Sequence, residues 1–212
     1  VYPEGDRTVL MYMIGDNNLS SAGYNNINSL LRGMKGVAGR VVIYFDPAGS
    51  APCLMTIKGS GSPVLDTIAL YDEENSADPA TLQRVIADTR RIFPSNSYGL
   101  ILWAHGSAWI PNKHSFPGAY SFRSVNIPYI HTKCFGPDQV LPDGGEAVYM
   151  DPEDLAMGIT SHFDFIMFDA CFMASVEVLY ELRDKADYFI ASPAEVLTDG
   201  FPYEAAAPYF WG

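Results

Sequence analysis

The chain has 212 residues, of which 48% are hydrophobic and 18% are charged, and its formal net charge is -12 at pH 7. This composition is typical of a globular chain that can bury one substantial core, so we expect a single domain over residues 1–212. The negative charge argues against binding to nucleic acid or to an anionic membrane, because both carry the same sign of charge as the protein. No apolar run reaches the roughly 18 residues that a membrane-spanning helix needs.

The two ends of the chain and its cysteines set further expectations. The chain starts at Val1 with no Met and no leader-like segment, and it stops at Gly212 just where a helix could begin. We therefore expect a processed protein whose natural chain continues past Gly212. The three cysteines, Cys53, Cys134 and Cys171, are too few and too irregularly spaced for a disulfide framework.

The amino-terminal part predicts two parallel strands joined by a helix. Residues Thr8 to Ile14 (TVLMYMI) are typical of a buried strand, and the turn-forming run GDNN over 15–18 ends it. A helix capped by Ser20 or Ser21 should follow, and a second strand is expected from Arg40 to Asp46. A strand, a helix and a strand at this spacing imply a crossover connection and a parallel sheet.

The middle of the chain predicts a hairpin, a helix and a third buried strand. Two short apolar pieces between Pro52 and Leu70, separated by GSGS, predict a small hairpin or edge strands. Asp78-Pro79 predicts the capped start of a helix that ends before Pro94. The run YGLILWA over Tyr98 to Ala104 predicts the strand, which His105-Gly106 closes.

Residues 107–150 show no sustained period and predict a long loop. They combine many glycines and prolines with polar and aromatic residues. A loop of this length is uncommon in a compact domain unless it is a lid, a binding loop or a processing site.

The carboxyl-terminal part returns to alternating helices and strands. The apolar run Phe165 to Phe168 predicts a strand buried on both faces, which Asp169-Ala170-Cys171 ends. The other expected elements are a helix from Asp151-Pro152 through Ile159, a helix from about Ala174 to Asp184, a strand from Asp187 to Ala191 and a loop from Ser192 to Tyr203.

Cys171 and His105 are the candidate catalytic residues. Each directly follows an apolar strand, and ligands of open parallel sheets bind outside the carboxyl ends of the strands. If these two strands are parallel neighbours, a thiol and an imidazole emerge together, as a cysteine nucleophile and its base require. A helix that begins just after Cys171 would favour the thiolate. The alternative is that Cys171 is only a small buried hydrophobic residue.

Three ordered motifs extend this hypothesis: YMIGDNNLS at 12–20, ILWAHGSAW at 101–109 and FDACFMASVEV at 168–178. Together they resemble the clostripain-like cysteine peptidases, which are relatives of the caspases, gingipains and legumain. The resemblance implies an α/β, caspase-like fold, with a mostly parallel sheet flanked by helices on both faces. It also implies that Cys171 is the nucleophile and His105 the general base of a dyad, with no third orienting residue. It further implies a secreted, cell-surface or periplasmic protein.

The resemblance implies an S1 pocket that binds Arg or Lys on the amino side of the cut. Asp169, two residues before the nucleophile, and Asp199, in the last loop, resemble the acidic residues of that pocket. This chain has SPAE where relatives tend to show a Ser-Glu pair directly, so Ser192 and Glu195 are further candidates for the pocket wall.

The backbone N–H groups of Cys171 and Gly106 are the expected oxyanion donors, because a glycine beside the base lets the backbone approach the substrate closely. No phosphate-binding loop and no HExxH motif is present, and the histidines show no metal-ligand spacing. We therefore expect no resident metal and no required cofactor. Calcium is an optional ligand, since some clostripain relatives use it and acidic loops could hold it.

Lys133, within the long loop, resembles the processing site of family members that are made as zymogens. Lys113 and Arg123 are the alternatives. Cleavage there would turn a monomer into two associated chains.

The resulting hypothesis is a cysteine endopeptidase that cleaves proteins or peptides after Arg or Lys through an acyl-enzyme on Cys171. One alternative is a non-catalytic module on the same scaffold that binds basic peptides without cutting them. Another is a small-molecule hydrolase or transferase that uses the same Cys and His on a different acyl compound.

Overall fold

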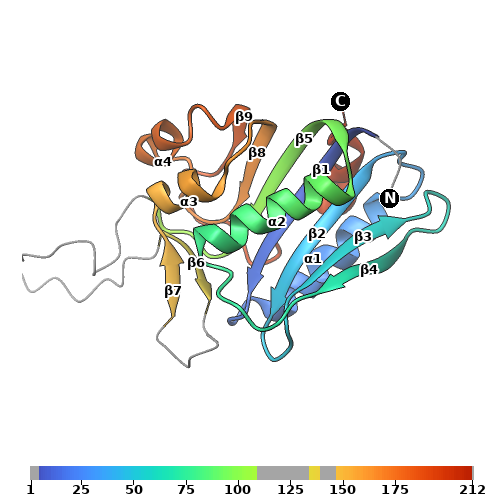
Figure 1. Cartoon of the computed structure of the whole chain (residues 1–212), viewed down its shortest axis with the longest axis horizontal. Coiled ribbons are helices and arrows are strands. Elements are labelled where there is room, and N and C mark those ends of the chain that lie inside the picture. The colour runs from blue at the N-terminus through green and yellow to red at the C-terminus, as the bar shows by residue number, and fades with distance from the viewer. Residues whose placement is uncertain (1–4, 109–133, 139–146, 212) are drawn as a thin grey trace, which may run out of the picture.

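The computed structural model describes residues 5–108, 134–138 and 147–211, and its centre is a seven-stranded sheet (Figure 1). The strand order is β4-β3-β2-β1-β5-β8-β9. Five neighbouring strands run parallel: β2, β1, β5, β8 and β9. At one edge of the sheet, β3 and β4 add an antiparallel hairpin. Both the mostly parallel sheet and the edge hairpin are thereby confirmed. The strands are β1 (Gly5–Gly15), β2 (Arg40–Pro47), β3 (Cys53–Lys58), β4 (Val64–Leu70), β5 (Ser95–Trp103), β8 (Phe163–Asp169) and β9 (Ala186–Ile190).

Helices cover both faces of the sheet (Figure 1). One hydrophobic layer lies beneath α2, α3 and α4, and a second lies beneath α1 and α5. The predicted cap of α2 is confirmed, because the Asp78 side chain accepts a hydrogen bond from the Ala80 N–H at 2.7 Å. The helices are α1 (Ser20–Gly33), α2 (Pro79–Ile92), α3 (Pro152–Gly158), α4 (Val176–Glu181) and α5 (Tyr203–Ala206), which a 3-10 turn, η2 (Ala207–Tyr209), follows.

Strand β1 shows why the central strands are apolar along their whole length. Alternate side chains of a strand point to opposite faces, and here both faces are covered. Leu10, Tyr12 and Ile14 therefore pack in one layer, whereas Met11 and Met13 pack in the other. All of these side chains are at most 1% exposed.

The register aligns the carboxyl ends of the three central strands. Met13 of β1 pairs with Trp103 of β5, and Trp103 pairs with Asp169 of β8. The segments that follow these strands therefore emerge at one edge of the sheet, where the sequence places His105 and Cys171.

The segment between β5 and α3 contains regular structure that the sequence did not predict. Strands β6 (Phe135–Asp138) and β7 (Val148–Met150) form an antiparallel pair, and Gly106 forms an isolated bridge with Phe135. The prediction of loop throughout 107–150 is therefore wrong for these residues. Strands of four and three residues are too short to show a period, and their pairing depends on tertiary contacts.

The start of α1 also differs from the prediction. Ser20 is the first residue of the helix rather than its cap, and its hydroxyl accepts a hydrogen bond from the Ala48 N–H at 3.2 Å. Asn17 instead supports the entry to the helix, because its Oδ1 accepts a hydrogen bond from the Leu19 N–H at 2.8 Å.

Helix α4 begins later than predicted, and this changes the surroundings of Cys171. Ser175 caps the helix, and the preceding residues 171–174 form turns. Phe172 has a φ of 62°, and its N–H donates to the carbonyl of Ala194 at 3.0 Å. The prediction that a helix N-terminus directly follows Cys171 is wrong, because this segment bonds to the loop after β9 instead of continuing as a helix.

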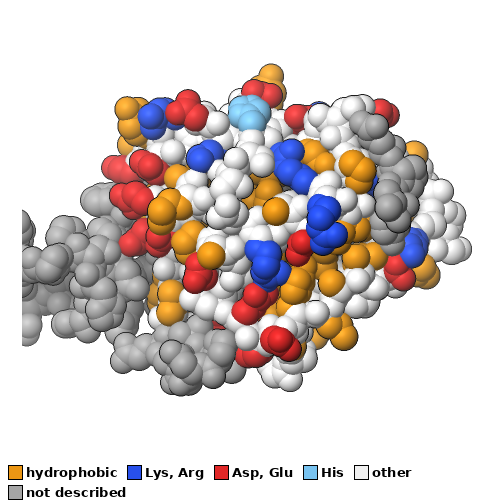
Figure 2. Space-filling view, in the orientation of Figure 1, with side chains coloured by type: hydrophobic (Ala, Val, Ile, Leu, Met, Phe, Trp, Pro, Cys, Tyr) orange, Lys and Arg blue, Asp and Glu red, His pale blue; other side chains and the backbone are white. Residues whose placement is uncertain are grey.

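The surface over α2 and α3 mixes acidic, basic and apolar side chains (Figure 2). Helix α2 contributes Arg84, which pairs with Glu74, and Arg91, which pairs with Asp88. Among the helices of the described ranges, none has the length and apolarity required to cross a bilayer.

Candidate active site

Cys171 and His105 line one pocket at the carboxyl edge of the sheet. The pocket has a volume of about 190 Å³. Cys171 reaches it from the turn after β8, and His105 reaches it two residues after the end of β5. The structure therefore brings together the two side chains that the sequence proposed as nucleophile and base. The lining is completed by Leu19, Trp103, Ala104, Asp169, Ala170, Val196, Leu197, Thr198 and Gly200.

The imidazole of His105 has a defined partner. Its Nε2 lies 2.8 Å from Oδ1 of Asn18, in the GDNN run that follows β1. The sequence hypothesis did not include Asn18, because one asparagine in a turn-forming run signals only the turn.

The thiol of Cys171 contacts the loop that follows β9. The Val196 N–H donates to Sγ at 3.3 Å, and Sγ donates to the Val196 carbonyl at 3.6 Å. Both contacts use main-chain atoms of Val196, which every residue type has. The sequence could therefore not indicate that Val196 lies beside the thiol.

Gly106 lies against the backbone of Cys171. A Cβ atom added to Gly106 would lie 2.5 Å from the carbonyl oxygen of Cys171 and 3.0 Å from Cβ of Ala170. The two expected oxyanion donors, the N–H groups of Gly106 and Cys171, therefore belong to segments in close contact.

Asp169 is a buried carboxyl group of the pocket. Asp169 is 4% exposed. Its Oδ2 accepts hydrogen bonds from the Tyr203 hydroxyl at 2.6 Å and from the Phe201 N–H at 3.2 Å. Burial raises the pKa of Asp169, and the two hydrogen bonds oppose that rise. Gly200 lines the same pocket, and a Cβ at this position would lie 2.6 Å from Oδ2 of Asp169.

The other proposed pocket residues lie farther from the nucleophile. Asp199 is exposed and its carbonyl accepts a hydrogen bond from the Asn26 side chain at 3.2 Å, while its neighbours Thr198 and Gly200 line the pocket. The Ser192 hydroxyl accepts a hydrogen bond from the Ala194 N–H at 3.1 Å. Within the part of the chain that the structure describes, neither Asp199 nor Ser192 is in the lining of this pocket.

The structure gives the other two cysteines different surroundings. Cys134 is fully buried, and burial together with the carboxylates of Asp151, Glu153 and Asp154 raises the pKa of its thiol. Burial likewise raises the pKa of Cys53, in the edge hairpin. A raised thiol pKa disfavours the nucleophilic thiolate, so neither residue competes with Cys171 for the catalytic role.

Two further predictions concern processing and metals. Lys133, the predicted processing site, and its alternatives Lys113 and Arg123 lie outside the described residues. The next residue, Cys134, is held in place, because its carbonyl accepts a hydrogen bond from the Ser107 N–H at 3.0 Å. Across residues 5–108, 134–138 and 147–211, no group of three or more His, Cys, Asp or Glu side chains is arranged to hold a metal ion.

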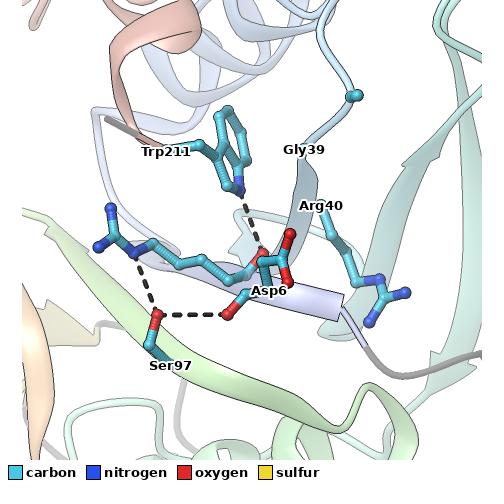
Figure 3. Close-up of a pocket in the computed structure, with 7 residues that line it drawn as sticks. Asp6, Gly39, Arg40, Ser97 and Trp211 are labelled. Atoms are coloured by element: carbon cyan, nitrogen blue, oxygen red, sulfur yellow. Dashed lines mark hydrogen bonds between the residues drawn. The ribbon is translucent and has the colours of Figure 1, made fainter.

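A larger pocket lies at the opposite, amino-terminal edge of the sheet (Figure 3). It has a volume of about 340 Å³ and is lined by Asp6, Arg7, Arg40, Ser97 and Trp211, among others. The Arg7 guanidinium is already bound to Ser97, to Asp164 and to the Phe210 carbonyl, and the Trp211 indole donates to the Arg7 carbonyl at 3.1 Å. These bonds hold Phe210 and Trp211 against the sheet, whereas the smaller pocket contains Cys171 and His105, the candidate catalytic residues.

Comparison with known proteins decides the family. The family model described as the Clostripain family matches residues 11–210, which is nearly the whole chain. This chain belongs to the clostripain family. The membership confirms the family resemblance of the sequence motifs and makes a cysteine peptidase site the expected chemistry of the pocket.

Individual relatives agree with this assignment. Clostripain from Hathewaya histolytica is 29% identical over 149 residues, which is 67% of this chain and 26% of that protein. A secreted C11 cysteine protease from Bacteroides thetaiotaomicron, solved with an irreversible peptide inhibitor, is 37% identical with a TM-score of 0.82. An inactive zymogen C11 protease from Parabacteroides distasonis is 33% identical with a TM-score of 0.78.

These relatives are longer than the chain described here. The two solved structures match 98% and 100% of this chain but only 54% and 56% of their own lengths. The chain therefore spans little more than half of the solved relatives and about a quarter of clostripain.

Proposed function

We propose that this chain carries the active site of a cysteine endopeptidase that cleaves after Arg or Lys. The observation that supports it most directly is a single pocket that contains Cys171, His105 and the buried carboxyl group of Asp169. A nucleophile, a base and an acidic side chain in one pocket are the parts that cleavage after a basic residue requires.

The proposed reaction proceeds through an acyl-enzyme. The imidazole of His105 takes the thiol proton of Cys171, and Sγ attacks the scissile carbonyl carbon. The N–H groups of Cys171 and Gly106 stabilise the oxyanion of the tetrahedral intermediate. The C–N bond then breaks as the imidazolium gives its proton to the leaving amine. Water, deprotonated by the same imidazole, hydrolyses the thioester and restores the thiol.

The contact between Cys171 and Val196 bears on the first step. The Val196 N–H and carbonyl are both within hydrogen-bonding distance of Sγ. A substrate carbonyl must approach Sγ from the pocket that Val196 lines. Productive binding therefore requires the loop after β9 to exchange its hydrogen bonds with Sγ for contacts to the substrate.

Asp169 is proposed as the main determinant of specificity. Its carboxyl group is almost completely buried, and among the described residues the donors to Oδ2 are neutral: the Tyr203 hydroxyl and the Phe201 N–H. A guanidinium or ammonium group in the pocket would favour the ionised form of Asp169, offsetting the cost of burying a negative charge. Asp199, exposed in the rim loop, and Ser192 and Glu195 nearby are proposed to complete the approach to this pocket.

The remaining expectations belong to the same proposal. Two of the solved relatives are called secreted C11 proteases, which supports secretion of the protein that contains this chain. One relative is called an inactive zymogen, which supports activation by cleavage after Lys133 into two associated chains. We propose a reaction that needs no cofactor, with calcium as an optional ligand.

The test is hydrolysis of fluorogenic peptides that end in Arg, Lys, Asp or Leu, with calcium and with a chelator. We expect turnover after Arg and Lys only, and none from Cys171→Ala. Asp169→Asn should lower kcat/KM for the Arg peptide by about 100-fold, because removing one partner of a buried charge pair costs ~2–5 kcal/mol. Tight binding of the Arg peptide without turnover, in folded protein cleaved after Lys133, would overturn the peptidase in favour of a binding module.

A further inference from the structure

We propose that Asn18 is a positioning residue for His105, so that the catalytic unit has three members rather than two. The proposal rests on the proposed role of His105 as the general base. The Asn18 side chain acts through the imidazole and does not itself contact the reacting atoms.

The hydrogen bond between these residues selects one tautomer of the imidazole. Nε2 of His105 lies 2.8 Å from Oδ1 of Asn18, and an amide oxygen only accepts hydrogen bonds. Nε2 must therefore carry the proton in the neutral ring. Nδ1 is then the unprotonated nitrogen, and proton transfer from a thiol must take place there.

The fold brings Asn18 and His105 together by strand pairing. Asn18 lies five residues after Met13 of β1, and His105 lies two residues after Trp103 of β5, and Met13 pairs with Trp103 in the parallel register. The pairing of β1 with β5 therefore places the turn that carries Asn18 next to the segment that carries His105.

The neighbouring Asn17 fixes the turn that carries Asn18. Its Nδ2 donates to the Pro137 carbonyl at 2.8 Å and to the Ile14 carbonyl at 3.3 Å, and its Oδ1 accepts from the Leu19 N–H at 2.8 Å. Asn17 is 6% exposed, whereas Asn18 is exposed. One asparagine thus builds the turn and the next presents its amide to the base.

A neutral amide suits this position better than a carboxylate. The pocket already contains Asp169, and the chain carries a net charge of -12. A second carboxylate beside the imidazole would stabilise its protonated form, which cannot accept the thiol proton. Asn18 orients the ring without adding charge.

The first arm of the test is kinetic. We expect Asn18→Ala to lower kcat on an Arg peptide by roughly 10- to 100-fold, the loss typical when a side chain that orients a metal-ligating histidine is removed, with KM within about twofold. Asn18→Asp should keep part of kcat and move the lower pH limb of kcat/KM upward, because a carboxylate raises the pKa of imidazolium. Asn28→Ala, an exposed change on α1, is the matched control and should leave kcat and the pH profile unchanged.

The second arm does not need activity. Nitrogen-15 NMR of the His105 ring in the Cys171→Ala protein should show the Nε2–H tautomer, and Asn18→Ala in the same background should give a mixture of tautomers. An Nδ1–H ring with Asn18 in place would overturn the proposal, as would wild-type kcat in a folded Asn18→Ala protein. If the wild-type enzyme proves inactive on every peptide, the proposed function fails while the NMR result still decides the role of Asn18.

Discussion

Gly106 has no room for a side chain. A Cβ at this position would lie 2.5 Å from the Cys171 carbonyl oxygen and 3.1 Å from Sδ of Met173. The carbonyl oxygen belongs to the main chain of Cys171, so relief of the clash must displace either Cys171 or His105, the residue before Gly106. The positions of Cys171 and His105, the proposed catalytic pair, thus depend on the absence of a side chain at Gly106.

We therefore predict that Gly106→Ala lowers kcat/KM for an Arg peptide by about 100-fold, the cost of displacing a reacting group by about 1 Å. Thermal unfolding measured alongside separates this effect from loss of fold. Gly61→Ala is the control, because nothing lies within 4 Å of a Cβ at that position. Wild-type kinetics in Gly106→Ala would show that the two segments do not need their close approach.

Among single residues, the sequence predicted those whose side chains can act as nucleophile or base. Cys171 and His105 follow buried strands, and the structure places both in one pocket. It could not predict Val196, which reaches Sγ with main-chain atoms. It also did not predict that Ser192 bonds within its own turn, because loop conformation is set by tertiary contacts such as the bond from the Ala174 N–H to the Ser192 carbonyl.

At the scale of elements, α1 and α5 cross at Gly33, the last residue of α1. A Cβ on Gly33 would lie 2.7 Å from the Tyr203 carbonyl oxygen and 2.8 Å from Cα of Glu204. The contacted atoms are main-chain atoms of α5, which cannot rotate away. The same helix carries Tyr203, whose hydroxyl donates to Asp169, so this crossing also supports the pocket.

We predict that Gly33→Ala destabilises the protein by about 1–3 kcal/mol, the usual cost of overpacking a close contact. The sign of the stability change distinguishes the two cases, because Gly→Ala in an unhindered helix stabilises the protein by roughly 0.5–1 kcal/mol instead of destabilising it. Urea unfolding of Gly33→Ala and Gly61→Ala gives the comparison. Equal stability of Gly33→Ala and wild type would mean that α5 shifts at no cost.

The elements that the sequence predicted well are those with their own local signals. Helix α2 has a capping Asp78, a Pro at its first position and a periodic apolar face, and it was predicted within one or two residues. Strands β6 and β7 have no such signal, because they are held by the bridge to Gly106 and by the bond from Asn17 to the Pro137 carbonyl. Helix α4 starts late because Phe172 and Ala174 bond to the loop after β9.

Across the whole molecule, the fold brings together buried acidic groups from segments that are distant in the sequence. Asp46 at the end of β2 and Asp138 at the end of β6 are both 0% exposed. Burial is the main cause that raises the pKa of Asp46 and of Asp138. Repulsion from Asp138, Glu73 and Asp16 adds to the rise at Asp46, and repulsion from Asp16 and Glu73 adds to the rise at Asp138, where a hydrogen bond with Asp46 opposes it. Contacts with Ser76 oppose the rise without cancelling it. Four segments that are distant in sequence thus share one electrostatic environment, which no local pattern could predict.

This pair should make stability fall as the pH rises. In the unfolded chain both carboxyl groups lose their protons near the ordinary Asp pKa of about 4, whereas in the folded protein they retain them to higher pH. Between these values the folded state binds more protons than the unfolded state, so the free energy of unfolding decreases by up to about 1.4 kcal/mol per pH unit for each retained proton. The contribution is complete below the ordinary pKa and is lost as pH rises through the raised one.

We predict that Asp46→Asn flattens this dependence and is more stable than wild type at alkaline pH, because a neutral amide cannot acquire the charge that burial penalises. Urea unfolding from pH 5 to pH 9 measures the free energy of unfolding of both proteins. Asp184→Asn, which changes an exposed surface carboxylate, is the control and should follow wild type. Parallel curves for wild type and Asp46→Asn would mean that the Asp46–Asp138 pair is ionised in the folded state across the whole range.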